Sequence, residues 1–281
     1  MKKLTLTPQK CGKIHIGKKS MECPILNVHK EKIRDSDSEK YLGYIISNKG
    51  TLDNTMKDQK LKGYSYIAEI RVLLSDMPFV RRRIEVGLML RYAMFVNGIL
   101  TNSEAWHSIT EQHIQDLEVM DRMLLKYILG AHSTIHTEFL YSETGATPLK
   151  QVITCRRIVY LHTILKRPAT ELTHKVYKAQ QENPVKGDWV QLLEKDLEML
   201  GMVLNEDKVK ELSKAQYKTE IKSRVKSVVI ELLQKKQEEH TKIKHIKYEK
   251  LSMQKYLKSH MFNSHEASTL ISLRSRQNFV F

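Results

Sequence analysis

Residues that interrupt helices are scarce in this chain, which has 11 glycines and 6 prolines among 281 residues. Because glycine and proline are the main breakers of regular structure, their scarcity predicts long helices joined by few turns. Cysteine is rarer still, with only Cys11, Cys23 and Cys155. Three cysteines are too few for a disulfide framework, so we expect a reducing, intracellular environment, in either the nucleus or the cytoplasm.

Long apolar runs are also missing from the sequence. The most apolar stretch, residues 87–100, is interrupted by Arg91 and Asn97, and it is too short and too polar to span a bilayer. Lys2 and Lys3 near the start are not followed by the apolar segment of a secretory signal. We therefore expect a soluble protein without a membrane partner.

Positive charge is in excess, with 47 Lys and Arg against 32 Asp and Glu, which gives a net charge of +15 at pH 7. A large positive field favours polyanions, because binding releases the counterions condensed on them. The proportions of hydrophobic residues (41%) and charged residues (28%) are those of a globular protein, which argues against wholesale disorder. A nucleic-acid ligand and a basic protein with no specific ligand both fit this balance.

The spacing of apolar residues changes along the chain. Two patterns near the N-terminus predict short strands. Apolar residues alternate with polar ones at Leu4, Leu6, Ile14 and Ile16, and residues 41–46 form a β-branched and aromatic run. Helical spacing follows, and it predicts helices over residues 54–74, 78–99, 110–130, 147–167, 171–181, 188–200 and 215–237. The expected fold is mainly α, a multi-helix bundle with a small β element of hairpin-like strands at the N-terminus.

The longest of these helices, over residues 215–237, carries two different stripes. Its expected buried face consists of Tyr217, Ile221, Val225, Val228 and Leu232. Lys218, Lys222 and Lys226 form a second stripe, in which like charges four residues apart repel each other by a few tenths of a kcal/mol per pair. A bound anion would relieve that repulsion, so the stripe is a candidate phosphate contact, although a solvated basic face is the simpler interpretation.

Two motifs near the start point to a known family. The segment from Leu4 to Cys11, LTLTPQKC, precedes the segment Tyr41-Leu42-Gly43. In this order they resemble the end of the palm and the primer grip of reverse transcriptases from non-long-terminal-repeat (LINE-type) retrotransposons. The later helical stretches resemble the thumb and linker of the same family. The resemblance implies palm-end and primer-grip strands over residues 1–50, a thumb-like bundle over 51–130 and a basic helical linker or C-terminal region over 131–281.

The implied activity of the whole family enzyme is RNA-directed DNA polymerisation with two divalent metal ions, normally Mg²⁺. The family's catalytic aspartates lie upstream of the primer grip, and this chain begins after them. Its closest paired carboxylates, Asp35 and Asp37, have charged, turn-like flanks that are typical of a solvated loop. We therefore expect no catalytic residue and no cofactor in this fragment, which would hold RNA or an RNA–DNA hybrid by its backbone and be inactive alone.

The resemblance also assigns roles to single residues. The family places a lysine near the departing pyrophosphate, here Lys10, although a plain surface lysine is the alternative. Gly43 would let the primer backbone approach closely, or would only support an ordinary hairpin. Arg81, Arg82 and Arg83 are consecutive, so they cannot all be buried in the core, and arginine suits bidentate phosphate contacts. The predicted nucleic-acid contacts are Lys10, Tyr41, Leu42, Gly43, Arg81, Arg82, Arg83, Arg91, Arg156, Arg157, Lys218, Lys222 and Lys226.

No metal site is predicted from the sequence. Cys11, His15, Cys23 and His29 lack the closely spaced cysteine pair of a zinc finger or knuckle. A second pair, His132 and His136, lacks the intervening glutamate of a metalloprotease helix, so both are expected in a loop. As an alternative function, the chain is a non-catalytic helical interaction module or a captured relic of a mobile element.

Overall fold

The computed structural model describes residues 11–16, 25–28, 31–41, 43–75, 83–240, 242–244, 246–258 and 263–276. The chain divides into two compact units, Met1–Gln59 and Lys60–Phe281. The expected fold class is confirmed, because the described residues are mainly helical and the strands lie near the N-terminus. In the described part of the chain, no helix combines the length and the apolar character needed to cross a membrane.

The first unit holds short paired strands. β1 (Gly12–Lys13) pairs in parallel with β4 (Arg34–Asp35), and β2 (Asn27–Val28) pairs antiparallel with β3 (Glu31–Lys32). β5 (Ser38–Tyr41) and β6 (Tyr44–Ser47) form an antiparallel hairpin in which Tyr41 lies opposite Tyr44. Gly43, in the turn between these strands, has a φ of +84°, a conformation that favours glycine. The strand expected around Leu4 and Leu6 lies outside the described residues.

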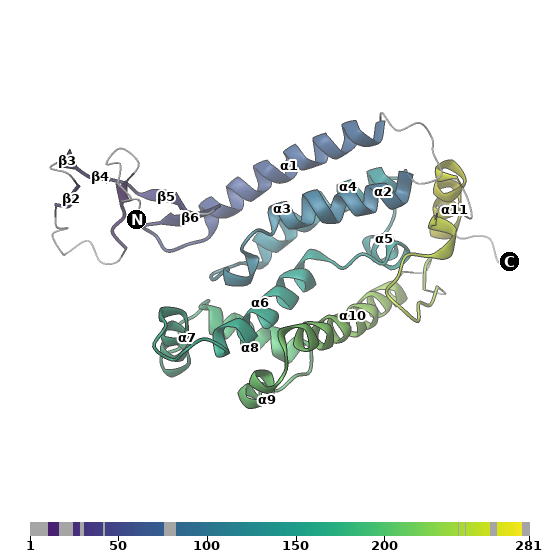
Figure 1. Cartoon of the computed structure of the whole chain (residues 1–281). Helices are drawn as coiled ribbons and strands as arrows, with labels where there is room; N and C mark the ends of the chain where they lie inside the picture. The colour runs from purple at the N-terminus through teal and green to yellow at the C-terminus, as the bar shows by residue number, and fades with distance from the viewer. Residues whose placement is uncertain are drawn as a thin grey trace. The chain divides into compact units, whose positions relative to one another are not determined.

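The helices follow in chain order, and α1 begins in the first unit. They are α1 (Asp53–Ser75), α2 (Arg83–Leu90), the π-helical η2 (Arg91–Val96), α3 (Asn97–Ile99), the 3₁₀ turn η3 (Ser103–Ala105), α4 (Glu111–Leu129), α5 (Thr137–Thr144), α6 (Leu149–Leu165), α7 (Leu172–Glu182), α8 (Trp189–Met199), α9 (Glu206–Glu211), α10 (Lys214–Glu238), the 3₁₀ turn η4 (Lys255–Leu257) and α11 (Ser264–Arg276) (Figure 1).

Local side-chain chemistry sets the ends of the main helices. Thr110 caps α4 by accepting a hydrogen bond from the backbone N–H of His113 at 3.1 Å, and Gly130 ends the helix at a φ of +59°. Ser213 caps α10 in the same way, and the side chain of Gln216 accepts from the Ser213 backbone N–H in return. Both helices lie within one or two residues of their predicted bounds.

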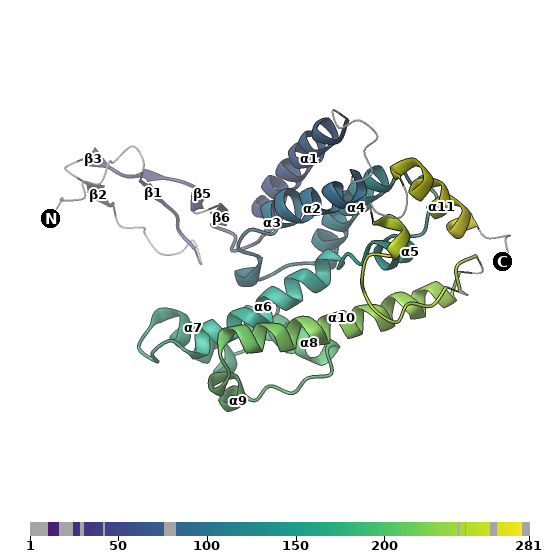
Figure 2. The same cartoon turned by 45° about the vertical axis from the view of Figure 1, so that its right-hand side comes forward.

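The core of the second unit surrounds α6, which packs against α4, α7, α8, α9, α10 and η3. Figures 1 and 2 both show α6 and α10 side by side. Ile158, Leu161 and Leu165 of α6 belong to one buried cluster with Ile221 and Val225 of α10. Each buried aliphatic side chain contributes roughly 1.5–3 kcal/mol to folding. This contact fixes which face of α10 is turned inward, and so which residues lie at the edge of the contact.

Candidate nucleic-acid interface

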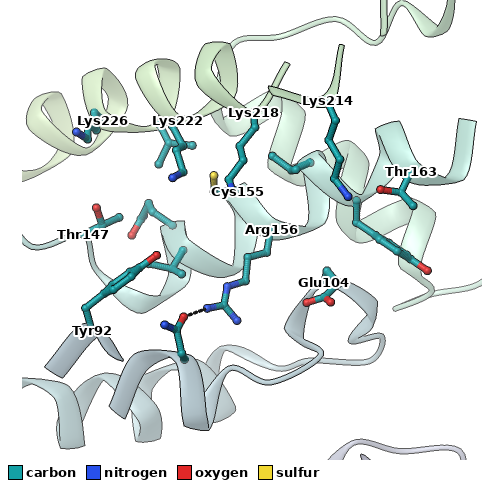
Figure 3. A pocket seen from close by; sticks show the side chains of 16 residues that line it. Tyr92, Glu104, Thr147, Cys155, Arg156, Thr163, Lys214, Lys218, Lys222 and Lys226 are labelled. Atoms are coloured by element: carbon teal, nitrogen blue, oxygen red, sulfur yellow. Dashed lines mark hydrogen bonds between the residues drawn. The ribbon is translucent and has the colours of Figure 1, made fainter. Parts of the chain in front are cut away.

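A groove of about 690 Å³ lies in the second unit, between α6, α10 and the segment from η2 to η3 (Figure 3). Its lining carries five cationic side chains and one acidic side chain. We call it the basic groove. The charged residues that line it are Lys214, Lys218, Lys222, Lys226, Arg156 and Glu104.

The four lysines form one wall of the groove, and we call them the lysine row. They are spaced four residues apart on α10. The buried residues Tyr217, Ile221 and Val225 each come directly before a lysine of the row, so packing against α6 places the lysines at the rim. All four are exposed, and among the described residues none has an ion-pair or hydrogen-bond partner for its ammonium group. No described acid therefore relieves their mutual repulsion by direct pairing.

Arg156 lies in the opposite wall, on α6, and its guanidinium is held in place. Nη2 donates to Oδ1 of Asn97 at 2.7 Å, the bond drawn in Figure 3. Nη1 donates to the backbone carbonyl of Leu100 and to Oγ of Ser103. All three acceptors are neutral, so none of them compensates the positive charge of the guanidinium. Its orientation is fixed before any ligand arrives.

Cys155 lines the groove and is half-buried, so the pKa of its thiol depends on burial and on the charges around it. Burial raises the pKa of its thiol, because the thiolate loses hydration. Lys222, Lys218 and Arg156 oppose this effect and lower the pKa, since their positive charges favour the thiolate. Three cations from the two walls therefore act on the same point in the groove.

The structure corrects the prediction for Arg91. Its Nε and Nη2 donate to the two carboxylate oxygens of Asp121, each at 2.6 Å, and its side chain is only 6% exposed. The hydroxyl of Tyr141 also donates to Asp121, at 2.9 Å. Arg91 is therefore part of the buried core, where a phosphate group has no access to it.

Arg157 requires the same correction. It is 3% exposed and forms an ion pair with Asp196 of α8, while the hydroxyl of Thr154 donates to the same carboxylate at 2.6 Å. Adjacent residues of a helix point about 100° apart. Arg156 therefore reaches the groove while Arg157 points into the interior.

The other predicted contacts lie elsewhere or outside the described residues. Arg83 is half-buried, with its Cζ 5.7 Å from the centre of the Tyr127 ring, and it does not line the groove. Tyr41 is 65% exposed and, with Gly43, belongs to the hairpin of the first unit. Lys10, Leu42, Arg81 and Arg82 are not described.

The two carboxylates considered for divalent metal each contact a neighbouring side chain. Asp35 pairs with Lys13 at 2.7 Å, and this hydrogen bond is the main reason that the pKa of Asp35 is lowered. Asp37 accepts a hydrogen bond from Nδ2 of Asn48 at 2.6 Å. Both carboxylates therefore form contacts within the first unit.

The structure also adds Lys214, Glu138 and His240 to the residues that the sequence singled out. Lys214 extends the predicted lysine stripe by about one helical turn. Its position four residues before Lys218 could have predicted it from the sequence. A separate group, His136, Glu138 and His240, lies together although its members come from distant parts of the chain. Nothing in the sequence connects His240 to the other two residues.

Comparisons with protein-family models, with curated proteins and with solved structures found no match for this chain. Its function is therefore argued from the basic groove and from the order of the motifs in the sequence.

Proposed function

We propose that this chain is the nucleic-acid-holding part of a retrotransposon reverse transcriptase, comprising the primer grip, the thumb and the linker. In this proposal the lysine row and Arg156 bind the sugar–phosphate backbone of RNA or of an RNA–DNA hybrid. The observation that carries it is a row of four lysines without described acidic partners, facing an arginine already held in position. The like charges repel by a few tenths of a kcal/mol per neighbouring pair, and a bound polyanion would relieve that repulsion.

The dimensions of the row suit a strand of nucleic acid. Lys214 and Lys226 are separated by twelve helical residues, or roughly 18 Å at 1.5 Å per residue. One strand of double-stranded DNA rises about 3.4 Å per nucleotide, and the rise of an A-form hybrid is smaller, so the row spans roughly five nucleotides or more. Ammonium groups contact phosphates as point charges and carry no code for base edges, so the binding is independent of sequence.

Binding of a fluorescent RNA–DNA hybrid at low salt tests this proposal. Replacing Lys218 and Lys222 by glutamine removes two charges from the groove and is expected to weaken binding equally for unrelated sequences. The matched control replaces Lys175 of α7 and Lys195 of α8 by glutamine, because both are exposed and neither lines the groove. Equal losses in the two double variants would show that general charge, and not the groove, binds the hybrid.

The proposal does not include polymerisation by this chain alone, because its paired carboxylates Asp35 and Asp37 have the charged, turn-like flanks of a solvated loop. A primer-extension assay with Mg²⁺ is expected to show no incorporation, and any template-dependent extension would contradict this part. If the wild-type chain fails to bind hybrid or RNA at low salt, the helical interaction module becomes the better interpretation.

A further inference from the structure

A second cluster of chemically active side chains lies away from the basic groove. His136 immediately precedes α5, and Glu138 lies in the first turn of that helix. His240 comes two residues after the last residue of α10. The fold thus brings His240 next to two residues that precede it by about 100 positions in the chain.

The three side chains are already close to one another. One ligand atom from each lies within 4.8 Å of the other two. Nε2 of His240 is 3.7 Å from Oε2 of Glu138. The imidazole rings of His136 and His240 have centroids 4.0 Å apart, with an angle of 30° between their planes. Although His136 occupies the cap position of α5, its side chain does not cap the helix.

We propose that His136, Glu138 and His240 bind a Zn²⁺ ion. Zinc is held at about 2.0–2.2 Å by imidazole nitrogen and carboxylate oxygen, so two ligand atoms of a tetrahedral site lie roughly 3.4 Å apart. The His240–Glu138 distance is within a few tenths of an ångström of that value. The ligand atom of His136 lies within 4.8 Å of the other two, so its imidazole has to turn toward them to complete the site. Two histidines and one glutamate leave a fourth position for water.

The choice of metal follows from the donor atoms. Two imidazole nitrogens suit zinc and its neighbours in the transition series, whereas Mg²⁺ and Ca²⁺ prefer sites built only from oxygen. Lys126 and Lys242 also lie near His136, and their charges oppose a cation. The negative charge of Glu138 offsets part of that repulsion.

The ion would join the beginning of α5 to the end of α10. Because a metal that binds only the folded chain stabilises it, Zn²⁺ at a hundredfold excess over its dissociation constant is expected to raise the unfolding midpoint by roughly 5–10 °C. Zinc binding at this cluster is independent of nucleic-acid binding in the basic groove, so a chain that binds no Zn²⁺ can still bind the hybrid.

Titration with Zn²⁺, followed by calorimetry and thermal unfolding, tests the site in the full chain. His136→Ala and His240→Ala are each expected to weaken the tightest binding event by more than the roughly 10- to 100-fold typical of losing a supporting residue. His132→Ala is the matched control, because His132 is exposed, contacts Thr134 and lies outside the cluster. It is expected to bind Zn²⁺ like the wild type.

Co²⁺ gives a second measurement with the same variants. A site of nitrogen and oxygen ligands is expected to give visible d–d absorption without the thiolate-to-metal charge-transfer band that cysteine ligands would add. His240→Ala, at a partly exposed position after α10, covers the case in which His136→Ala does not fold. Unchanged affinity in His240→Ala, equal losses in His132→Ala, or a thiolate band would each overturn the proposal.

Discussion

Arg91 donates from Nε and Nη2 to the two carboxylate oxygens of Asp121, joining η2 to α4 inside the helical unit. Both side chains are buried, and Tyr141 of α5 donates to the same carboxylate. Three helical segments therefore meet at one acid. The positive charge that the sequence offered as a phosphate contact instead serves to hold the bundle together.

Asp121→Ala is expected to lower the free energy of unfolding by about 3–5 kcal/mol, because it leaves the Arg91 guanidinium buried without its partner. Urea denaturation measures this loss. Asp116→Ala is the control, since Asp116 pairs with Lys60 where both side chains are partly exposed, and such pairs contribute only about 0–1 kcal/mol. Similar losses in the two variants would contradict the structural role given to Asp121.

Glu143 is expected to hold the C-terminal segment in place. It is fully buried and accepts hydrogen bonds from the hydroxyls of Tyr248 and Tyr256 and from Arg274 of α11. Glu143→Ala leaves these donors without their acceptor, so a loss of about 2–4 kcal/mol is expected. Hydrogen exchange should then show faster exchange in α11 than in α4, whereas the exposed control Glu249→Ala should leave α11 protected.

Alkaline pH is expected to destabilise the helical unit through Tyr217. Burial raises the pKa of Tyr217 to about 12, whereas an unfolded tyrosine has a pKa of about 10. Between these values the unfolded chain releases a proton that the folded chain keeps, so stability falls as pH rises from 10 to 12. Tyr217→Phe should remove roughly 1–2 kcal/mol of this fall. If stability falls as steeply between pH 10 and 12 in Tyr217→Phe as in the wild type, the role given to Tyr217 is wrong.

The reactivity of Cys155 provides a test of the groove that does not require an affinity measurement. Lys218 and Lys222 lower the pKa of its thiol, so Lys218→Gln with Lys222→Gln should raise that pKa and slow alkylation at neutral pH. A background with Cys11→Ser and Cys23→Ser isolates the signal. Bound RNA–DNA hybrid should protect Cys155, and alkylation unaffected by hybrid would place the ligand elsewhere.

The sequence predicted the helical character and most helix bounds, because caps such as Thr110 and Ser213 act locally. The buried stripe of α10 was right for Tyr217, Ile221 and Val225, but it continues through Val229 and Leu233 instead of Val228 and Leu232. A step of four residues drifts around a helix with 3.6 residues per turn. The buried face therefore turns along α10, which packs against both α6 and α5. A single apolar stripe in the sequence does not show that the helix has two packing partners.

Long-range pairing explains most other differences between sequence and structure. Asp121 lies 30 positions from Arg91, and Asp196 lies 39 positions from Arg157. Sequence spacing does not show which cation will meet a buried acid. The lysine row was easier to predict, because its regular spacing is confined to one helix. His240 could not be joined to His136 and Glu138 without the fold that brings α10 to α5.

The salt dependence of hybrid binding tests the central proposal most directly. Each phosphate contact contributes about 0.7–0.9 to the slope of the logarithm of the binding constant against the logarithm of salt concentration. Replacing all four lysines of the row by glutamine should therefore reduce the slope by roughly 3 for any hybrid sequence, while Lys175→Gln with Lys195→Gln leaves it unchanged. An unchanged slope in the fourfold variant would contradict the assignment of the basic groove as the nucleic-acid interface.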